Sequence, residues 1–288
     1  MMRDDYEHFF HHYLDTSQIF EKYNGELKLN ILEFFGFYDR FKKFSWGKIY
    51  LLLRILNNNK TEYDLEIASN IELLCLSAKL LDDFFDDDHP LSRTIEEKNR
   101  ILLASELLIH SLMLLSKVNG FHSYSYLLHQ SVIGEFNDLN LTIDDIENIE
   151  EDYRNNILKK TTAILQFICK VSGMNDEFSY QFSDSFGFII QVRNDLKAIY
   201  NLKKSDLYFS RPTLPILFAF HSSSEMKKNE WLGLSQEKRQ EWVRNSGSIE
   251  YCRFLLGEAS LTVTELLRKH FDDIEWSCSD FENHLRGA

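Results

Sequence analysis

Apolar side chains recur every three or four residues along most of this chain, and this spacing is the period of an α-helix. No comparable stretch shows the strict alternation that is typical of a β-strand. Glycine and Asn/Ser clusters interrupt the pattern at intervals that suit long helices joined by short loops. The pattern predicts an all-α fold with helical segments at Ile19–Phe35, Trp46–Leu56, Ile67–Phe85, Lys98–Val118, Tyr124–Leu139, Ile146–Val171, Phe178–Tyr200, Thr213–Phe220 and Ser248–Phe271.

The composition supports this fold class and narrows the possible functions. Only three prolines occur among the 288 residues, and no stretch resembles an interdomain linker, so we expect a single domain over residues 1–288. The formal net charge of −13 repels polyanions and argues against nucleic acid as a partner. The first residues lack the layout of a secretory signal, and no apolar stretch is long enough for a transmembrane segment. We therefore expect a cytoplasmic protein, in which the four scattered cysteines form neither disulfides nor a zinc site.

An acidic cluster ends one of the apolar helical segments. Five of the seven residues from Asp82 to Asp88 are acidic. Negative charge is unfavourable at a helix C-terminus, and neighbouring carboxylates repel one another. Asp82 and Asp86 share a helical face with Asp83 close by, and carboxylate oxygens are the ligands that Mg²⁺ prefers. The cluster predicts a magnesium site, and a solvated, charged helix end is the alternative.

A second polar stripe lies on an otherwise apolar helical segment about a hundred residues later. Gln191, Asn194 and Asp195 are spaced three and four residues apart, so they share one face. Buried polar groups are unfavourable unless they are satisfied, so the stripe forms an internal hydrogen-bond network or faces a wet cavity. Considered with the first cluster, it predicts two oxygen-rich faces that clamp several magnesium ions between them.

Basic residues accompany the two acidic segments. Lys160 and Thr161 lie in an amphipathic segment between them, and Arg211 follows the second. Cations near acidic sites in an acidic protein indicate a bound anion, and a diphosphate would sit naturally between metal ions and Lys or Arg side chains. For each lysine taken singly, a solvated helix face is the alternative.

The order and spacing of these motifs resemble those of the trans-isoprenyl diphosphate synthase superfamily, from about Trp46 to Phe220. The resemblance implies an isoprenoid-synthase-type helical bundle around a central cavity, and a homodimer. The family's first aspartate-rich motif DDxxD matches Asp82–Asp86, its GQxxDL motif matches Gly134–Leu139, and its KT motif matches Lys160–Thr161. Its second aspartate-rich helix matches Phe186–Asp195, and the end of its GKxTLP motif matches Arg211–Pro215.

The chain departs from this family in the region that binds isopentenyl diphosphate. Lys48 is kept from the family's GGKRxRP motif, but Ile49 and Leu51 replace its arginines, and Cys75 replaces a histidine. Each lost charge-assisted contact to phosphate is worth about 1.5–3 kcal/mol, so we expect poor binding of this substrate. The second aspartate-rich motif is also degenerate, because Asn194 replaces its first aspartate.

This combination is similar to the ComQ-type quorum-sensing prenyltransferases, which modify a tryptophan of a precursor peptide pheromone. The resemblance implies Mg²⁺-dependent ionisation of an allylic diphosphate, geranyl or farnesyl, and transfer of the prenyl group to the indole. The implied catalytic residues are Asp82, Asp83, Asp86, Asp195 and Lys160, with Mg²⁺ on Asp82, Asp83, Asp86, Asn194 and Asp195. The implied substrate contacts are Lys48, Thr161, Gln191, Arg211, and the small residues Ser77 and Ala78, which would leave room for the prenyl tail.

Three other functions remain open at this point. A short-chain prenyl diphosphate synthase is favoured by Lys48 and the KT motif and disfavoured by the missing arginines. A class I terpene cyclase would need a Ser or Thr and then a Glu where Ala198 and Leu202 stand. A catalytically silent binding subunit would leave the complete first aspartate-rich motif without a purpose.

Overall fold

The computed structural model describes residues 3–16, 45–85, 96–200, 211–223, 230–231, 233–271 and 277–286. These residues form helices and turns and no β-strand, so the predicted all-α class is confirmed. None of the described helices is both long enough and apolar enough to cross a membrane. The predicted helix at Ile19–Phe35 lies outside the described residues. The chain divides into two compact units, which are described separately, and the single domain with a central cavity stays a prediction.

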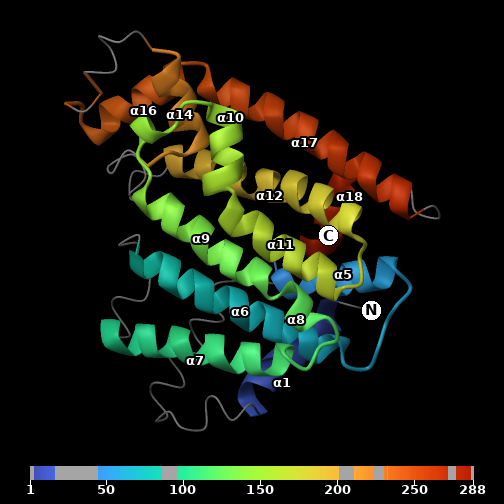
Figure 1. The fold of residues 1–288 in the computed structure, drawn as a ribbon. Coiled ribbons are helices and arrows are strands. Elements are labelled where there is room, and N and C mark those ends of the chain that lie inside the picture. Colours follow the sequence, from blue (N-terminus) through green and yellow to red (C-terminus); the bar gives the residue numbers. More distant parts are fainter. Residues whose placement is uncertain are drawn as a thin grey trace. The chain divides into compact units, whose positions relative to one another are not determined.

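The first unit comprises residues 1–124, 168–174 and 279–288. Helix α6 packs against α1, α5 and α7, and α6 and α7 run side by side (Figure 1). Every residue from Ile71 to Ser77 on α6 is buried, because neighbouring helices cover it on several sides. The helices of this unit are α1 (Arg3–Thr16), α5 (Trp46–Leu56), α6 (Asp64–Phe85), α7 (Glu97–Leu115) and α8 (Phe121–Tyr124).

The second unit comprises residues 125–167 and 175–278. Helix α12 packs against α14 and α17, and a ladder of phenylalanines lines its buried face. The ring centroids of Phe178 and Phe182 are 5.2 Å apart, and those of Phe182 and Phe186 are 5.1 Å apart. The helices of this unit are α9 (Tyr126–Asn140), η1 (Ile143–Asp145), α10 (Ile149–Asp152), η2 (Tyr153–Ile157), α12 (Asp176–Ile199), α14 (Leu214–His221), α16 (Gln236–Asn245) and α17 (Ser248–His270), while α11 (Lys159–Val171) and α18 (Cys278–Arg286) have residues in both units.

Several predicted helices agree with the observed ones to within a few residues. The predicted segment Trp46–Leu56 coincides with α5. At the start of α12 the side chain of Asn175 accepts a hydrogen bond from the Phe178 backbone N–H at 2.8 Å, which caps the helix. Residues 146–171, predicted as one helix, instead form α10, the turn η2 and α11. Turn η2 is π-helical, and the N–H of Leu158 donates to the carbonyl of Tyr153 at 2.8 Å.

Helix α9 approaches the first turn of α11 closely at Gly134. A Cβ atom at this position would lie 2.8 Å from the carbonyl carbon of Lys159, and closer still to the backbone nitrogen of Lys160. The hydroxyl of Ser131, one turn earlier on α9, donates to the Lys160 carbonyl at 2.7 Å. Backbone atoms cannot move aside as the end of a flexible side chain can, so the contact requires glycine.

Replacing Gly134 with alanine should therefore destabilise the protein. Overpacking against backbone is expected to lower the free energy of unfolding by about 1–3 kcal/mol, measured by urea denaturation. Gly257→Ala on α17 is the matched control, because a Cβ there meets no atom within 4 Å. That substitution should be neutral or stabilise by up to about 1 kcal/mol. Equal stability of the two variants would contradict the close approach.

Candidate active site

The first acidic cluster lies at the C-terminal end of α6, where two carboxylates converge on one cation. The ammonium of Lys79 lies 2.6 Å from Oδ1 of Asp83 and also contacts the carboxylate of Asp82. Asp83 is buried and Asp82 is half-buried. Lys79 lies one helical turn before both aspartates, which places all three on the same side of α6. Asp86 lies outside the described residues.

The electrostatics of this cluster follow from that convergence. Burial lowers the pKa of Lys79, but the two neighbouring carboxylates raise it by more, so the net shift is upward and the ammonium stays charged. The carboxylates are thus arranged to share a cation, which is the arrangement that a divalent ion requires of its oxygen ligands. Lys79 was not among the predicted site residues, although its spacing of three and four from the aspartates is visible in the sequence.

The region around Lys48 is buried. Lys48 is buried at 6% exposure, and Ile49 and Leu51 are buried at 0% and 7%. Glu72 of α6 holds the start of α5 in place, because its Oε2 accepts hydrogen bonds from the Ser45 hydroxyl at 2.7 Å and from the Gly47 backbone N–H at 2.9 Å. The two residues that stand where the superfamily has arginines are therefore part of the hydrophobic core of the first unit.

The two small residues before the acidic cluster differ in their surroundings. Ser77 is fully buried, and its hydroxyl donates to the Ala104 carbonyl of α7 at 2.7 Å. Ala78 is exposed. Ser77 thus serves the packing of α6 on α7, whereas Ala78 leaves open space beside α6. Their contact with a prenyl tail stays a prediction.

The second predicted motif contains a buried carboxylate that joins three elements of the second unit. Asp195 of α12 is 3% exposed. Its Oδ2 accepts hydrogen bonds from the Tyr153 hydroxyl at 2.7 Å and from the Leu214 backbone N–H at 3.1 Å, and its Oδ1 accepts one from Nε2 of Gln191 at 3.0 Å. These donors lie on η2, α14 and α12. The carboxylate is satisfied by hydrogen bonds, as a buried ionised group must be.

Hydrogen bonds continue from this carboxylate to the start of α11. Oε1 of Gln191 accepts a hydrogen bond from the Thr161 hydroxyl at 3.2 Å. The adjacent Lys160 is held on α9, where its ammonium lies 2.5 Å from Oδ2 of Asp138 and 3.2 Å from Oε2 of Glu135. The structure therefore brings together four predicted residues of the second unit: Lys160, Thr161, Gln191 and Asp195.

Tyr153 was not found from the sequence, because it lies on no polar stripe. It is fully buried, and burial together with the nearby charge of Asp195 raises its pKa well above the usual range, so the hydroxyl stays protonated and donates. The ring packs edge to face against Phe188, with centroids 6.2 Å apart. No local sequence signal identifies this residue.

The remaining predicted residues of the second unit are more accessible than Asp195. Asn194 is exposed on α12, and Arg211 is half-buried shortly before α14. Within the described ranges, no three His, Cys, Asp or Glu side chains are grouped so as to hold a metal ion. Asp82 and Asp195 belong to different units, so a metal clamp between them stays a prediction.

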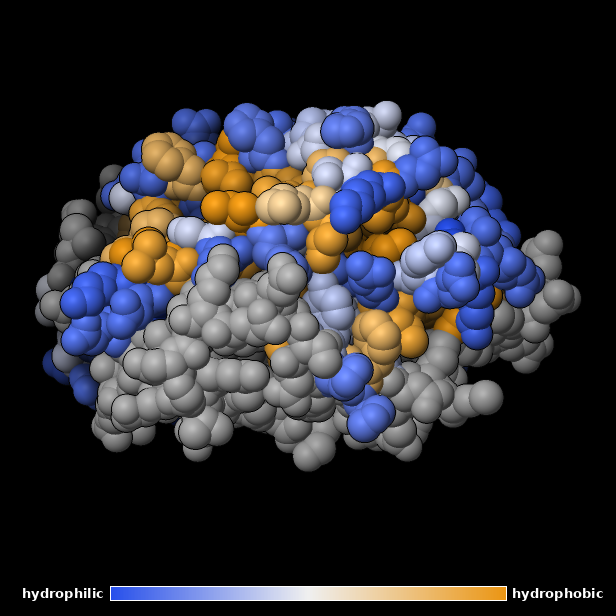
Figure 2. Space-filling model, turned by 90° about the horizontal axis from the view of Figure 1, so that it is seen from below, coloured by the Kyte–Doolittle hydropathy of each residue, from blue (hydrophilic) through white to orange (hydrophobic). Residues whose placement is uncertain are grey.

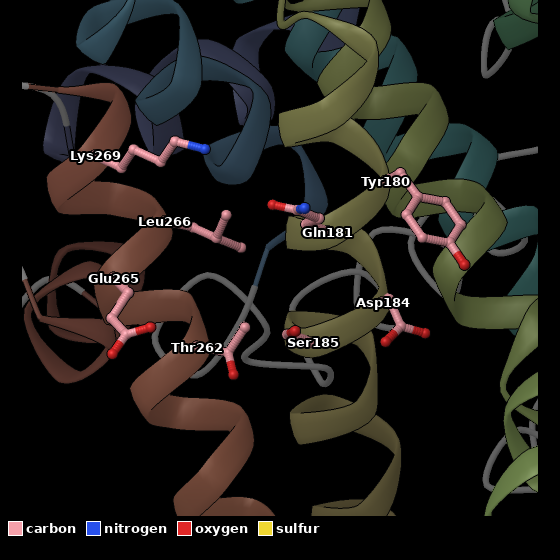
Figure 3. Close-up of a pocket in the computed structure, with 8 residues that line it drawn as sticks. All are labelled: Tyr180, Gln181, Asp184, Ser185, Thr262, Glu265, Leu266 and Lys269. Carbon is pink, nitrogen blue, oxygen red and sulfur yellow. The ribbon is translucent and has the colours of Figure 1, made fainter.

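A groove on the second unit lies outside these clusters. It runs between α12 and α17 and has a volume of about 430 Å³ (Figure 3). None of the predicted site residues lines it. The side chains along it are Tyr180, Gln181, Asp184 and Ser185 of α12 and Thr262, Glu265, Leu266 and Lys269 of α17.

Two kinds of known protein are similar to this chain, although no protein-family model matches it. A tryptophan prenyltransferase ComQ of Bacillus subtilis subsp. natto is 25% identical over 284 residues, which covers 89% of this chain and 88% of that protein. A tryptophan prenyltransferase ComQ of Bacillus spizizenii is 26% identical over 206 residues, with 66% and 72% covered.

Solved structures agree over nearly the whole length. The heptaprenyl diphosphate synthase of Staphylococcus aureus superposes with a TM-score of 0.75 at 16% identity and covers 100% of this chain and 99% of its own. The geranylgeranyl pyrophosphate synthase of Bacteroides thetaiotaomicron gives a TM-score of 0.70 at 20% identity, with 99% and 94% covered. This chain has the isoprenyl diphosphate synthase fold. This fold and the distant ComQ homologues confirm the predicted relationship to enzymes that transfer prenyl groups.

The convergence of two carboxylates on Lys79 generates a prediction. Lys79→Met should raise the affinity of the protein for Mg²⁺ or Mn²⁺ at least about fivefold, because a dication no longer competes with an ammonium ion. Isothermal titration calorimetry at pH 8 without substrate measures this change. Lys117→Met, which removes an exposed lysine just beyond α7, is the control and should leave the affinity unchanged. Equal affinities in the wild type and Lys79→Met would contradict the shared cation.

Proposed function

We propose that this protein is a Mg²⁺-dependent prenyltransferase that ionises geranyl or farnesyl diphosphate and transfers the prenyl group to a tryptophan of a precursor peptide pheromone in quorum sensing. The observation that carries the proposal is the similarity over 89% of the chain to a tryptophan prenyltransferase. The isoprenyl diphosphate synthase fold supports the donor half of the reaction, because related structures with this fold are named as prenyl diphosphate synthases.

The first acidic cluster is the proposed site of the metal. Asp82 and Asp83 fit this role, since they already share the ammonium of Lys79, and Asp86 would join them. On α12 the exposed amide of Asn194 is available to a ligand. When bound, Mg²⁺ supplies positive charge that stabilises the departing diphosphate.

The chain's own cations complete the proposed diphosphate site. Lys160 adds fixed positive charge at the start of α11, where Asp138 and Glu135 hold its ammonium in place. Thr161 follows Lys160 directly, and Arg211 precedes α14. The guanidinium of Arg211 can donate hydrogen bonds to phosphate oxygens, and the backbone N–H groups and hydroxyl at the Lys160–Thr161 turn are further donors of this chemical type. Preorganised donors of this kind stabilise the charge that develops as the allylic C–O bond breaks.

The acceptor half of the proposal is supported by two residues of α5. Ile49 and Leu51 are core residues, so this region lacks the arginines with which the superfamily holds isopentenyl diphosphate. An acceptor site without these charges suits an indole ring, because burying the aromatic surface is favourable. An allylic cation shielded from water would then be captured by the electron-rich indole. A short-chain prenyl diphosphate synthase is the alternative that Lys48 still favours.

A comparison of two acceptors tests this function. Incubated with farnesyl diphosphate and Mg²⁺, the purified protein should prenylate members of a peptide library with one fixed tryptophan and should fail to elongate the donor with isopentenyl diphosphate. Mass spectrometry detects both products side by side. The same library with phenylalanine in place of tryptophan, and a reaction in excess EDTA, should give no product. Efficient elongation without prenylated peptide would make this protein a prenyl diphosphate synthase.

The surface of α7 supports the further proposal of a homodimer. This helix buries Leu103 and Leu107, yet Leu102, Ile109 and Met113 on its outer side are 64%, 59% and 65% exposed. Figure 2 shows hydrophobic residues reaching the surface in patches on the face seen from below. Clustered exposed apolar side chains mark interfaces. A second copy of the chain would cover this side of α7.

The double variant Ile109→Glu/Met113→Glu should separate the proposed dimer, because two carboxylates would be buried without partners. Light scattering coupled to size-exclusion chromatography should give twice the chain mass for the wild type and the single chain mass for the variant. Ser116→Glu, at an exposed position just beyond α7, is the control and should remain dimeric. A monomeric wild type would refute this proposal.

A further inference from the structure

We infer that Tyr153 is a positioning residue for the diphosphate site, and that Asp195, which it holds, anchors this site without binding a metal ion. This inference rests on the proposed function and deepens it, since it concerns how the second unit presents its diphosphate contacts. Tyr153 would touch neither substrate nor metal. It would act through the carboxylate of Asp195, 42 residues later in the chain.

The first argument is the burial of Asp195. Its side chain is 3% exposed, and donors from η2, α14 and α12 reach both of its oxygens. A carboxylate has about four lone-pair directions, and these hydrogen bonds use at least three of them. A metal ion at this carboxylate would lie against the positive ends of these donors or displace them inside a nearly dry site, where an unsatisfied donor is unfavourable. Asn194 beside it is exposed, so the neighbouring position is the accessible one.

The second argument is the backbone of η2. A π-helical turn places one extra residue in the helix, and such turns occur frequently at functional sites. This turn begins at Tyr153 and ends before Lys159, so it sets the register in which the first turn of α11 follows. Its next residue, Arg154, is fixed to α12, because its guanidinium lies 4.3 Å from the ring centroid of Phe188 and 2.7 Å from Oδ2 of Asp184. Contacts of two successive residues therefore attach the turn to α12.

The third argument is what the carboxylate connects. Asp195 accepts a hydrogen bond from the backbone N–H of Leu214, which is the first residue of α14. The segment that carries Arg211 lies directly before this residue. Gln191 of α12 also donates a hydrogen bond to Asp195, and it accepts one from the hydroxyl of Thr161, which is adjacent to Lys160. One buried acceptor thus ties the Arg211 segment and the Lys160–Thr161 turn to the same helix. Loss of the Tyr153 hydroxyl would loosen both predicted groups of diphosphate contacts at once.

Binding of inorganic pyrophosphate in the presence of Mg²⁺ tests the inference without requiring turnover. Tyr153→Phe removes only the hydroxyl and should weaken pyrophosphate binding about tenfold, the effect of losing one well-placed hydrogen bond to a charged group. The Mg²⁺ concentration for half-maximal binding should not change. Tyr251→Phe is the matched control, because the Tyr251 hydroxyl also donates to a carboxylate, that of Glu150 at 2.5 Å, outside this network. That variant should bind pyrophosphate as the wild type does.

A double-mutant cycle with Asp195→Asn separates an anchor from a metal ligand. If Asp195 acts through the network, Tyr153→Phe/Asp195→Asn should bind pyrophosphate no more weakly than Asp195→Asn alone, and neither variant should need more Mg²⁺. The inference would be overturned if the losses of pyrophosphate affinity in the two single variants multiplied in the double variant. It would also be overturned if Asp195→Asn alone needed a severalfold higher Mg²⁺ concentration. Unchanged binding in Tyr153→Phe would overturn it and leave the proposed function standing. A wild type that binds no pyrophosphate with Mg²⁺ would refute both.

Discussion

The second unit depends on the burial of one carboxylate. An ionised carboxyl group removed from water loses several kcal/mol of hydration, which must be offset by donors held at hydrogen-bonding distance. Asp195 meets this requirement with a tyrosine hydroxyl, a backbone N–H and a side-chain amide that come from three elements. The π-helical turn η2, the first residue of α14 and the register of α12 must therefore agree with one another. The same requirement ties these three elements of the second unit to one another.

Two pairs of carboxylates each share a lysine. Lys79 is shared by two carboxylates at the end of α6, and Lys160 is shared by two carboxylates of α9 at the start of α11. In a chain with a net charge of −13, such pairs reduce the repulsion that clustered carboxylates would otherwise cause. The two lysines differ in what a diphosphate and a metal ion would do to them. A dication would compete with Lys79 for the same oxygens, whereas an anion would compete with the carboxylates for Lys160.

The apolar residues on α5 have a structural role that constrains function. Ile49 and Leu51 lie in the core of the first unit, and Glu72 fixes the start of their helix through Ser45 and Gly47. Restoring arginines at these two positions would bury charge in a packed core. The apolar residues at these two positions are therefore part of the packing of α5 on α6.

The sequence by itself determined the all-α class, the approximate bounds of several helices, and which acidic and basic residues are candidates for the site. These follow from local properties, because the helical period reports which side of a segment is buried, and residue type reports what a side chain can bind. The sequence also contained the Lys79 spacing, since residues three and four apart meet on any helix.

Only the tertiary structure decided which groups satisfy one another. In the structure a π-helical turn interrupts the segment 146–171, and the hydroxyl of Ser77 donates to α7. The hydroxyl of Tyr153 donates to Asp195. The spacing of residues along the sequence does not predict these hydrogen bonds, because the two partners lie on different elements. They meet only when whole elements pack together. A hydrogen bond between residues 42 positions apart exists only once those elements have met.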